Sequence, residues 1–231
     1  MLFSVLKFVI AFWKDRYLPF ALKCSMVDFT ITGPIVGILA ISDVLLHIYL
    51  DTKKSTLREK SRLREPSVHV QYSAMIAVSI STLLSFALVL LIPIAWILEL
   101  EITELWFLIP IVEPSIPVWL SGLVLVILGI ILHSWSRYVR QEMAASWAMS
   151  EEHRLITTGP YSKVRHPSYT SYFLSFIGLF LLLPSVVALI MMIGFWGYYI
   201  AAVTEEQHLL NHFGGAYSEY MKRTGRFLPG L

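Results

Sequence analysis

The chain has 231 residues, of which 56% are hydrophobic and only 15% are charged. Soluble domains carry about 25% charged residues, and several apolar runs here reach the ~20 residues that a helix needs to cross a bilayer. The composition excludes an ordinary soluble protein and predicts an all-α integral membrane protein. A net charge of +2 gives no support for nucleic-acid binding, and a single cysteine excludes an intrachain disulfide.

The first predicted region covers residues 1–26. Its apolar part is short for a membrane span, and it carries residue types of the membrane interface, Trp13, Lys14, Arg16 and Tyr17. No small-residue cleavage site follows it, which argues against a signal peptide. We expect an amphipathic helix lying on the membrane, with a short or tilted extra span as the alternative.

The second region, residues 27–135, contains the first predicted membrane spans. Three transmembrane helices are expected at about 27–50, 72–98 and 118–135. The segment 51–69 is rich in Lys and Arg, which marks a cytoplasmic loop. The connection 99–117 carries acids but no Lys or Arg, so we expect it to face outward.

The third region, residues 136–231, begins with polar sequence and continues into a predicted helical hairpin. Its two helices are expected at 168–183 and 186–203, joined by a turn at Pro184 and Ser185. With so few turn residues, the two helices must be antiparallel neighbours. The chain is thus expected to be a bundle of about five transmembrane helices.

This topology predicts that two polar segments share one membrane face. The stretch 136–169 and the tail 204–231 fall on the same side as the basic loop, so we expect both, and the C-terminus, to be cytoplasmic. Folded together they form a cap that is open to water on one side and to lipid on the other.

Three blocks of this cap carry chemistry. The sequence HRLITTGPY, 153–161, contains a turn, because Gly relaxes the backbone and Pro fixes it. In RHPSY, 165–169, Pro167 suits the first turn of a helix. In the tail, Glu205 and Glu206 come where the last span is expected to end.

Each block has a simpler interpretation. Lys163, Arg165 and Tyr169 are also typical interfacial anchors, and the glutamate pair is also typical of a solvated helix end. His208 and His212 have the spacing of a metal pair, but no third ligand lies nearby in the sequence, so we expect no metal site.

Polar residues also fall inside the predicted spans. Asp43 and His47 are four residues apart, so they share a helix face and form either a functional group or a satisfied structural pair. His133, near the end of the third span, is expected at most to line a site.

In their joint order the motifs resemble those of the isoprenylcysteine carboxyl methyltransferases. A His-x-Leu-x-x-x-Gly-x-Tyr turn precedes Arg-His-Pro-x-Tyr, and a hairpin leads to paired glutamates with Phe-Gly-x-x-Tyr downstream. This family belongs to a wider set of integral-membrane methyltransferases that includes phospholipid N-methyltransferases. The motifs extend over about the last 80 residues. Upstream of them, the resemblance is limited to the pattern of spans and the basic loop.

The resemblance implies a cofactor, S-adenosyl-L-methionine, and a set of residues that hold it. The implied cofactor-binding residues are His153, Arg154, Leu155, Ile156, Tyr161, His166, Pro167, Ser168, Tyr169 and Glu205. Arg165 and Tyr169 are the candidate catalytic residues. A carboxylate suits the cationic groups of this cofactor, and a tyrosine ring suits its sulfonium or adenine.

The resemblance implies carboxyl O-methylation of an isoprenylcysteine-type acceptor, but the chain departs from the family at one acceptor-binding position. In the prenylcysteine enzymes an arginine one turn before the cofactor glutamate binds the substrate carboxylate, and here that position is Ala201. Either another arginine (Arg137, Arg140, Arg154 or Arg165) takes over, or the substrate lacks a carboxylate. The alternatives are a phospholipid or other lipid methyltransferase, an NADPH-dependent membrane reductase and a non-enzymatic scaffold.

The expected partners are membrane lipids and an amphipathic, lipid-like or prenylated acceptor, with no obligate protein partner. The resemblance does not identify the organism. A prokaryotic protein of this kind would lie in the cell membrane, and a eukaryotic one in the endoplasmic reticulum.

Overall fold

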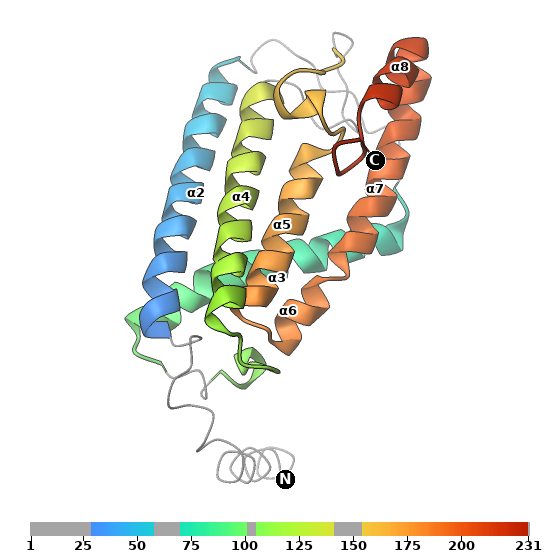
Figure 1. The fold of residues 1–231 in the computed structure, drawn as a ribbon. Coiled ribbons are helices and arrows are strands. Elements are labelled where there is room, and N and C mark those ends of the chain that lie inside the picture. The colour runs from blue at the N-terminus through green and yellow to red at the C-terminus, as the bar shows by residue number, and fades with distance from the viewer. Residues whose placement is uncertain (1–28, 58–69, 101–104, 141–153, 231) are drawn as a thin grey trace.

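The computed structural model describes residues 29–57, 70–100, 105–140 and 154–230, and these form an all-helical bundle. Figure 1 shows α2, α4 and α5 side by side, with α3 crossing behind them and α7 on the opposite flank. The helices are α2 (Phe29–Leu57), α3 (Tyr72–Ile97), α4 (Ile116–Arg140), α5 (Pro167–Leu182), α6 (Val186–Met191), α7 (Gly194–Phe213) and α8 (Gly215–Arg223), with short 3-10 turns at Trp106–Leu108 and Gly159–Ser162. The predicted all-α class is confirmed.

Four helices in the described part of the chain are long and apolar enough to cross a membrane. These are Ile31–Leu50, Tyr72–Ile97, Ile116–Arg140 and Val186–Phe213, where the last combines α6 and α7. The predicted fourth span is present as α5, but its 16 residues are short for a bilayer core. The expected five spans are therefore four candidate spans and one shorter apolar helix.

The last predicted span differs from the structure in two ways. The helix expected at 186–203 is interrupted after Met191, where Met192 and Ile193 donate to carbonyls only three residues back, and α7 then runs ten residues further, to Phe213. Just after this interruption, α7 comes into close contact with α3 at Gly197. A Cβ at Gly197 would lie 2.9 Å from the Ala74 carbonyl and from the Val78 amide of α3. The change of direction thus lets α7 lie directly on α3.

Other boundaries are close to those expected. Helix α2 continues to Leu57, so the first seven residues of the predicted loop 51–69 are helical, and α4 continues to Arg140. Helix α5 begins at Pro167, and Ser185 caps α6 by accepting a hydrogen bond from the Ala188 amide, which confirms the predicted hairpin turn. The predicted interfacial segment 1–26 lies outside the described residues.

Helices α4 and α5 meet backbone to backbone. A Cβ at Gly122 would lie 2.8 Å from the Gly178 carbonyl, and a Cβ at Gly178 would lie 2.7 Å from the Gly122 carbonyl. Further along, a Cβ at Gly129 would lie 2.4 Å from Ser175 Oγ. Small residues at such contacts are how helices associate in lipid, where hydrophobic burial gives little driving force.

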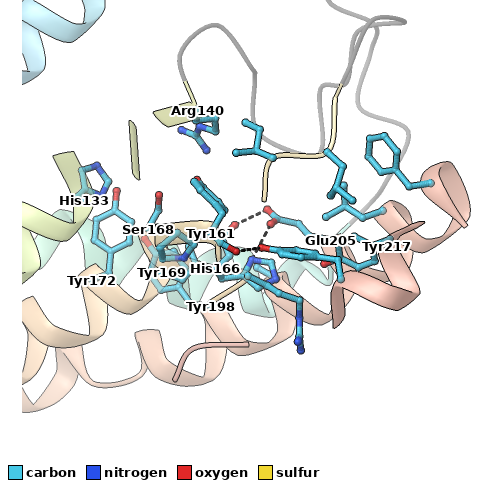
Figure 2. A pocket seen from close by; sticks show the side chains of 18 of the residues that line it. His133, Arg140, Tyr161, His166, Ser168, Tyr169, Tyr172, Tyr198, Glu205 and Tyr217 are labelled. Carbon is cyan, nitrogen blue, oxygen red and sulfur yellow. Dashed lines mark hydrogen bonds and ion pairs between the residues drawn. The ribbon is translucent and has the colours of Figure 1, made fainter. Parts of the chain in front are cut away.

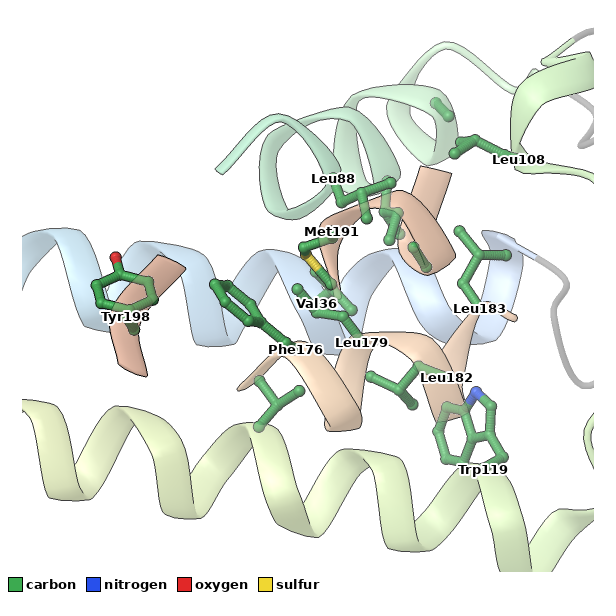
Figure 3. Packing of buried hydrophobic residues seen from close by; sticks show 14 residues of the cluster. Val36, Leu88, Leu108, Trp119, Phe176, Leu179, Leu182, Leu183, Met191 and Tyr198 are labelled. Atoms are coloured by element: carbon green, nitrogen blue, oxygen red, sulfur yellow. The ribbon is translucent and has the colours of Figure 1, made fainter. Parts of the chain in front are cut away.

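The core lies between this pair and the helices that cover it. Figure 3 shows Phe176 and Leu182 of α5 directed toward Met191, Leu88 and Trp119 from neighbouring elements. These side chains are almost fully buried, whereas many large apolar side chains on the outer faces of the helices are exposed. An exposed apolar surface of this extent is what lipid would cover.

The C-terminal segment closes over the start of α5. Val164 and Gly225 form an isolated parallel bridge, and the amides of Arg165 and His166 donate to the carbonyls of Gly225 (2.8 Å) and Arg226 (3.1 Å). Figure 1 shows this segment, in dark red, lying against the start of α5. The predicted packing of the two polar segments against each other is confirmed.

A buried ion cluster fixes this closure. Glu206 of α7 accepts from Arg165 Nε at 2.7 Å and from Arg226 Nη2 at 2.7 Å, and its side chain is 4% exposed. The Arg165 guanidinium also donates to the carbonyls of Met221 and Thr224. One carboxylate therefore joins α7, the start of α5 and the tail.

A first prediction concerns the α4–α5 contact. Gly178→Ala places a methyl group where there is no room, so overpacking lowers the free energy of unfolding by roughly 1–3 kcal/mol. Thermal unfolding in detergent measures the change. Gly215→Ala is the matched control, because a Cβ there meets no atom within 4 Å. Equal melting temperatures for the two variants would contradict the packing described.

A second prediction concerns the ion cluster. Glu206→Gln leaves two arginines without their counter-charge, and breaking a buried pair from one side costs about 3–5 kcal/mol. We expect a lower melting temperature and faster proteolysis after α8. Glu219→Gln is the control, because its ion pair with Lys222 is solvent-exposed and such pairs contribute less than about 1 kcal/mol. A Glu206→Gln protein as stable as the control would refute this role.

Candidate functional site

A cavity of about 290 Å³ lies where the polar segments meet α3, α4, α5 and α7. Figure 2 shows His133 and Tyr172 at one end of this cavity and Glu205 and Tyr217 at the other, with Arg140 above them. The lining residues are Met75, Val78, His133, Arg140, Arg154, Leu155, Ile156, Tyr161, Arg165, His166, Pro167, Ser168, Tyr169, Tyr172, Tyr198, Ala201, Glu205, Leu209, Phe213, Tyr217 and Tyr220.

Local sequence places the polar side chains at this junction. Gly159 has a φ of +59°, a conformation that favours glycine, and Pro160 follows it in the buried turn. The Tyr161 carbonyl then accepts a hydrogen bond of 2.6 Å from Tyr220 Oη, which ties the turn to α8. His166 is the N-cap of α5 and Pro167 its first residue. The RHPSY motif is thus the start of a helix at the cavity wall.

Glu205 is the buried carboxylate of the cavity. It is 7% exposed, accepts a 2.5 Å hydrogen bond from Tyr169 Oη at Oε1, and lies 3.5 Å from His166 Nδ1 at Oε2. The interpretation of Glu205 and Glu206 as a solvated helix end is wrong, because both are buried. These contacts hold the Glu205 carboxyl group in one position beside a largely aromatic wall.

His166 lies between the two glutamates. Its Nε2 is 3.3 Å from Glu206 Oε1, within ion-pair distance although without hydrogen-bond geometry. Burial opposes the charged imidazolium, but the carboxylates of Glu205 and Glu206 outweigh it and raise the pKa of His166 above its ordinary value. The imidazolium therefore links the cavity carboxylate to the ion cluster of the tail.

Some polar atoms at the cavity have no partner. Among the residues that the structure describes, the hydroxyls of Ser168 and Tyr217 are buried without a hydrogen bond. Burial raises the pKa of Tyr217 and of Tyr161, so both phenols are neutral donors. A buried polar group without a partner costs about 1–3 kcal/mol, which a ligand with polar atoms would recover.

One wall of the cavity is built of aromatic rings. Tyr169 stacks on His166 with ring centroids 5.4 Å apart and contacts Tyr198 at 4.8 Å. Tyr198 stacks on Tyr172 at 5.1 Å, and Tyr172 contacts His133 at 5.1 Å. The rings form a continuous surface from Glu205 to the far end, and faces of this kind suit cationic and planar ligands.

The structure brings the predicted site residues together. Arg154, Leu155, Ile156, Tyr161, His166, Pro167, Ser168, Tyr169 and Glu205 all line the cavity, and His153 lies outside the described residues. Arg165 also lines it, but its guanidinium is bound to Glu206 and to tail carbonyls. These contacts give Arg165 a structural role and lend no support to a catalytic one.

Sequence reasoning missed several lining residues. Tyr198 lies two helical turns before Glu205 on α7, and Leu209 and Phe213 lie one and two turns after it, so helical spacing around Glu205 was the signal that pointed to them. Tyr217 of α8 closes the Phe-Gly-x-x-Tyr motif but was given no role, and Tyr220 was not singled out. They reach the cavity because the tail closes over it, and no local sequence pattern predicts that closure. No group of three metal-ligating side chains occurs in the described ranges.

Comparison with known proteins shows where similarity concentrates. The model of the phospholipid methyltransferase family matches residues 118–216. A nickel-cobalt-cadmium resistance protein of Alcaligenes xylosoxydans xylosoxydans is 38% identical over 33% of this chain and 37% of its own length. Protein-S-isoprenylcysteine O-methyltransferases are 34% identical in Schizosaccharomyces pombe (35% of each chain) and 33% identical in Xenopus laevis (48% of this chain, 41% of that one).

The chain therefore spans well under half the length of these relatives. A solved eukaryotic isoprenylcysteine carboxyl methyltransferase aligns with 100% of this chain and 84% of its own, at a TM-score of 0.46 and 19% identity. The family match covers α4 to the start of α8, the part that forms most of the cavity. From α4 to the start of α8, the chain is therefore similar to the phospholipid methyltransferase family and to the protein-S-isoprenylcysteine O-methyltransferases.

Proposed function

We propose that this protein transfers a methyl group to an amphipathic acceptor held in the membrane, with S-adenosyl-L-methionine as the methyl donor. The observation that carries the proposal is the position of Glu205, a buried carboxylate at one end of a cavity whose wall is largely aromatic. Such a cavity suits two reactants of opposite character. Orienting them replaces a bimolecular encounter and supplies much of the rate.

The polar end fits the cofactor. S-adenosyl-L-methionine supplies an activated methyl group on a sulfonium, together with an ammonium and a carboxylate. Glu205 would hold a cationic group, the Tyr169 ring would face positive charge, and the hydroxyls of Ser168 and Tyr217 would satisfy polar atoms. Arg154 lines the same cavity and is exposed, so it would meet a carboxylate. These assignments remain proposals based on charge and position.

The apolar part of the lining fits a lipid-borne acceptor. Met75 and Val78 of α3 and Ala201 and Tyr198 of α7 contribute apolar and aromatic surface to the cavity. Ala201 stands where the prenylcysteine enzymes resembled here have an arginine, and it brings no charge to the wall. An acceptor carboxylate would need a cation from another element.

Arg140 is the arginine that the geometry favours for this purpose. Arg165 is already bound by Glu206 and the tail, and Arg137 does not line the cavity. Arg140 does line it, from the last turn of α4, and has no ion pair or hydrogen bond with the described residues. We therefore propose carboxyl O-methylation of an isoprenylcysteine-type lipid. A carboxylate needs no base because it is ionised at neutral pH.

Methylation of a phospholipid is the second candidate, since Arg140 would equally meet a phosphate. The similarity to methyltransferases supports this class over the reductase considered from the sequence. We also propose that the cavity opens to the cytoplasm, from the basic residues of the loop that precedes α3. The choice between a cell membrane and the endoplasmic reticulum depends on the organism.

A third prediction tests the cofactor site. Glu205→Gln keeps the shape of the side chain but removes its charge, so we expect binding of S-adenosylhomocysteine to be lost while the protein stays folded. Calorimetric titration of the purified protein in detergent measures the affinity. Glu219→Gln, on the exposed face of α8, serves as the control. Binding as tight as in the unaltered protein would show that Glu205 does not hold the cofactor.

A fourth prediction tests the acceptor. Arg140→Gln removes one charge-assisted contact worth about 1.5–3 kcal/mol, so KM for an anionic acceptor should rise at least about tenfold. The affinity for S-adenosylhomocysteine should stay unchanged. Arg223→Gln, an exposed change on α8, is the control. Transfer of labelled methyl groups to farnesylcysteine and to phosphatidylethanolamine separates the two candidates, and an unchanged KM for both would rule out Arg140.

A further inference from the structure

We propose that His133 positions the methyl acceptor, by accepting at its Nε2 atom a hydrogen bond from an N–H or O–H of the acceptor head group. This inference rests on the proposed function. It adds a selection among acceptors that recognition of the acceptor carboxylate alone would not give. His133 lines the cavity at the end opposite Glu205 (Figure 2). It lies seven residues before Arg140 on the same face of α4, or roughly 10 Å along the helix axis.

The proton on the His133 ring can be placed from its hydrogen bonds. His133 Nδ1 lies 3.2 Å from Ser171 Oγ, and Ser171 Oγ donates its only proton to the Ser168 carbonyl at 2.6 Å. Ser171 must therefore accept from His133, so Nδ1 carries the hydrogen and Nε2 keeps a lone pair. Arg137 and Arg140 lie one and two turns further along α4, and their positive charges disfavour a second proton on this ring.

The ring is also held in a fixed orientation by contacts from two neighbouring helices, α2 and α5. The His47 ring of α2 stacks on it with centroids 5.3 Å apart and 7° between the planes, and Tyr172 of α5 contacts it at 5.1 Å. His47 is itself fixed, because its Nδ1 donates to the Asp43 carbonyl at 2.8 Å and lies 3.4 Å from the Asp43 carboxylate. The Asp43–His47 pair expected from the sequence thus fixes the ring on which His133 stacks.

Burying a histidine ring in a membrane span costs free energy unless its polar atoms have partners. Ionisable side chains within a membrane span are rare and are usually functional. In the described part of the chain His133 Nε2 has no hydrogen-bond partner, so an acceptor without a donor group would bury it unpaired. A site built around a hydrogen bond rejects a ligand that lacks it far more strongly than an apolar pocket rejects one of the wrong size.

His133 is therefore a positioning and specificity-determining residue. The acceptor class that it favours has an N–H or O–H beside the group that is methylated, as an N-acylated cysteine lipid does. A simple thioether acid has the anion without the donor, and should be a poor acceptor.

The test compares two acceptors that differ in one amide group. N-acetyl-S-farnesylcysteine has an N–H next to its carboxylate, and S-farnesylthiopropionate does not. We expect the unaltered protein to prefer the first by at least about tenfold in kcat/KM, which corresponds to about 1.4 kcal/mol. His133→Phe should abolish the preference, and His133→Gln, whose side-chain oxygen accepts near the same position, should restore part of it.

Ser171→Ala provides a second variant that leaves the histidine in place. Without the hydroxyl the tautomer is no longer fixed, so the preference should shrink while binding of S-adenosylhomocysteine is unchanged. Calorimetric binding of both acceptors in the presence of S-adenosylhomocysteine gives a readout independent of turnover. Equal use of the two acceptors, equal binding, or a preference that survives in His133→Phe overturns the proposal. If the unaltered protein did not bind S-adenosylhomocysteine at all, that result would instead refute the proposed function.

Discussion

Two consecutive buried glutamates on α7 organise the polar half of this protein. Neighbouring residues on a helix point about 100° apart, so Glu205 faces the cavity while Glu206 faces the tail. Burying a carboxylate is costly unless it is paired and hydrogen-bonded, and each glutamate has its own partners. Arg165 and Arg226 neutralise Glu206, and Tyr169 and His166 hold Glu205. The closure of the tail and the shape of the cavity both follow from these contacts.

Much of the fold and of the cavity was predictable from local signals. Apolar length indicated the spans, Pro167 marked a helix start, and Pro184 with Ser185 marked the hairpin turn. The motif residues were grouped correctly because most of them fall in two short segments that the hairpin must bring to one end. The functional roles assigned to them stay predictions.

What could not be predicted depends on contacts between distant segments. The interruption before α7 follows from the close approach of Gly197 to α3, and the ten extra residues of α7 are helical where the composition has already become polar. Arg165 was a candidate for chemistry because its motif is shared, yet its partners come from residues 41 to 59 positions away. Tyr217 reaches the cavity for the same reason, through a tail whose path no local pattern specifies.

The glycine contacts divide the bundle into two stiff pairs. Gly122 and Gly178 leave no space between α4 and α5, and Gly197 leaves none between α7 and α3. The cavity takes its walls from both pairs. If the proposed lipid acceptor enters from the bilayer, the room for it therefore lies between the two pairs, because neither pair has space between its own helices at these glycines.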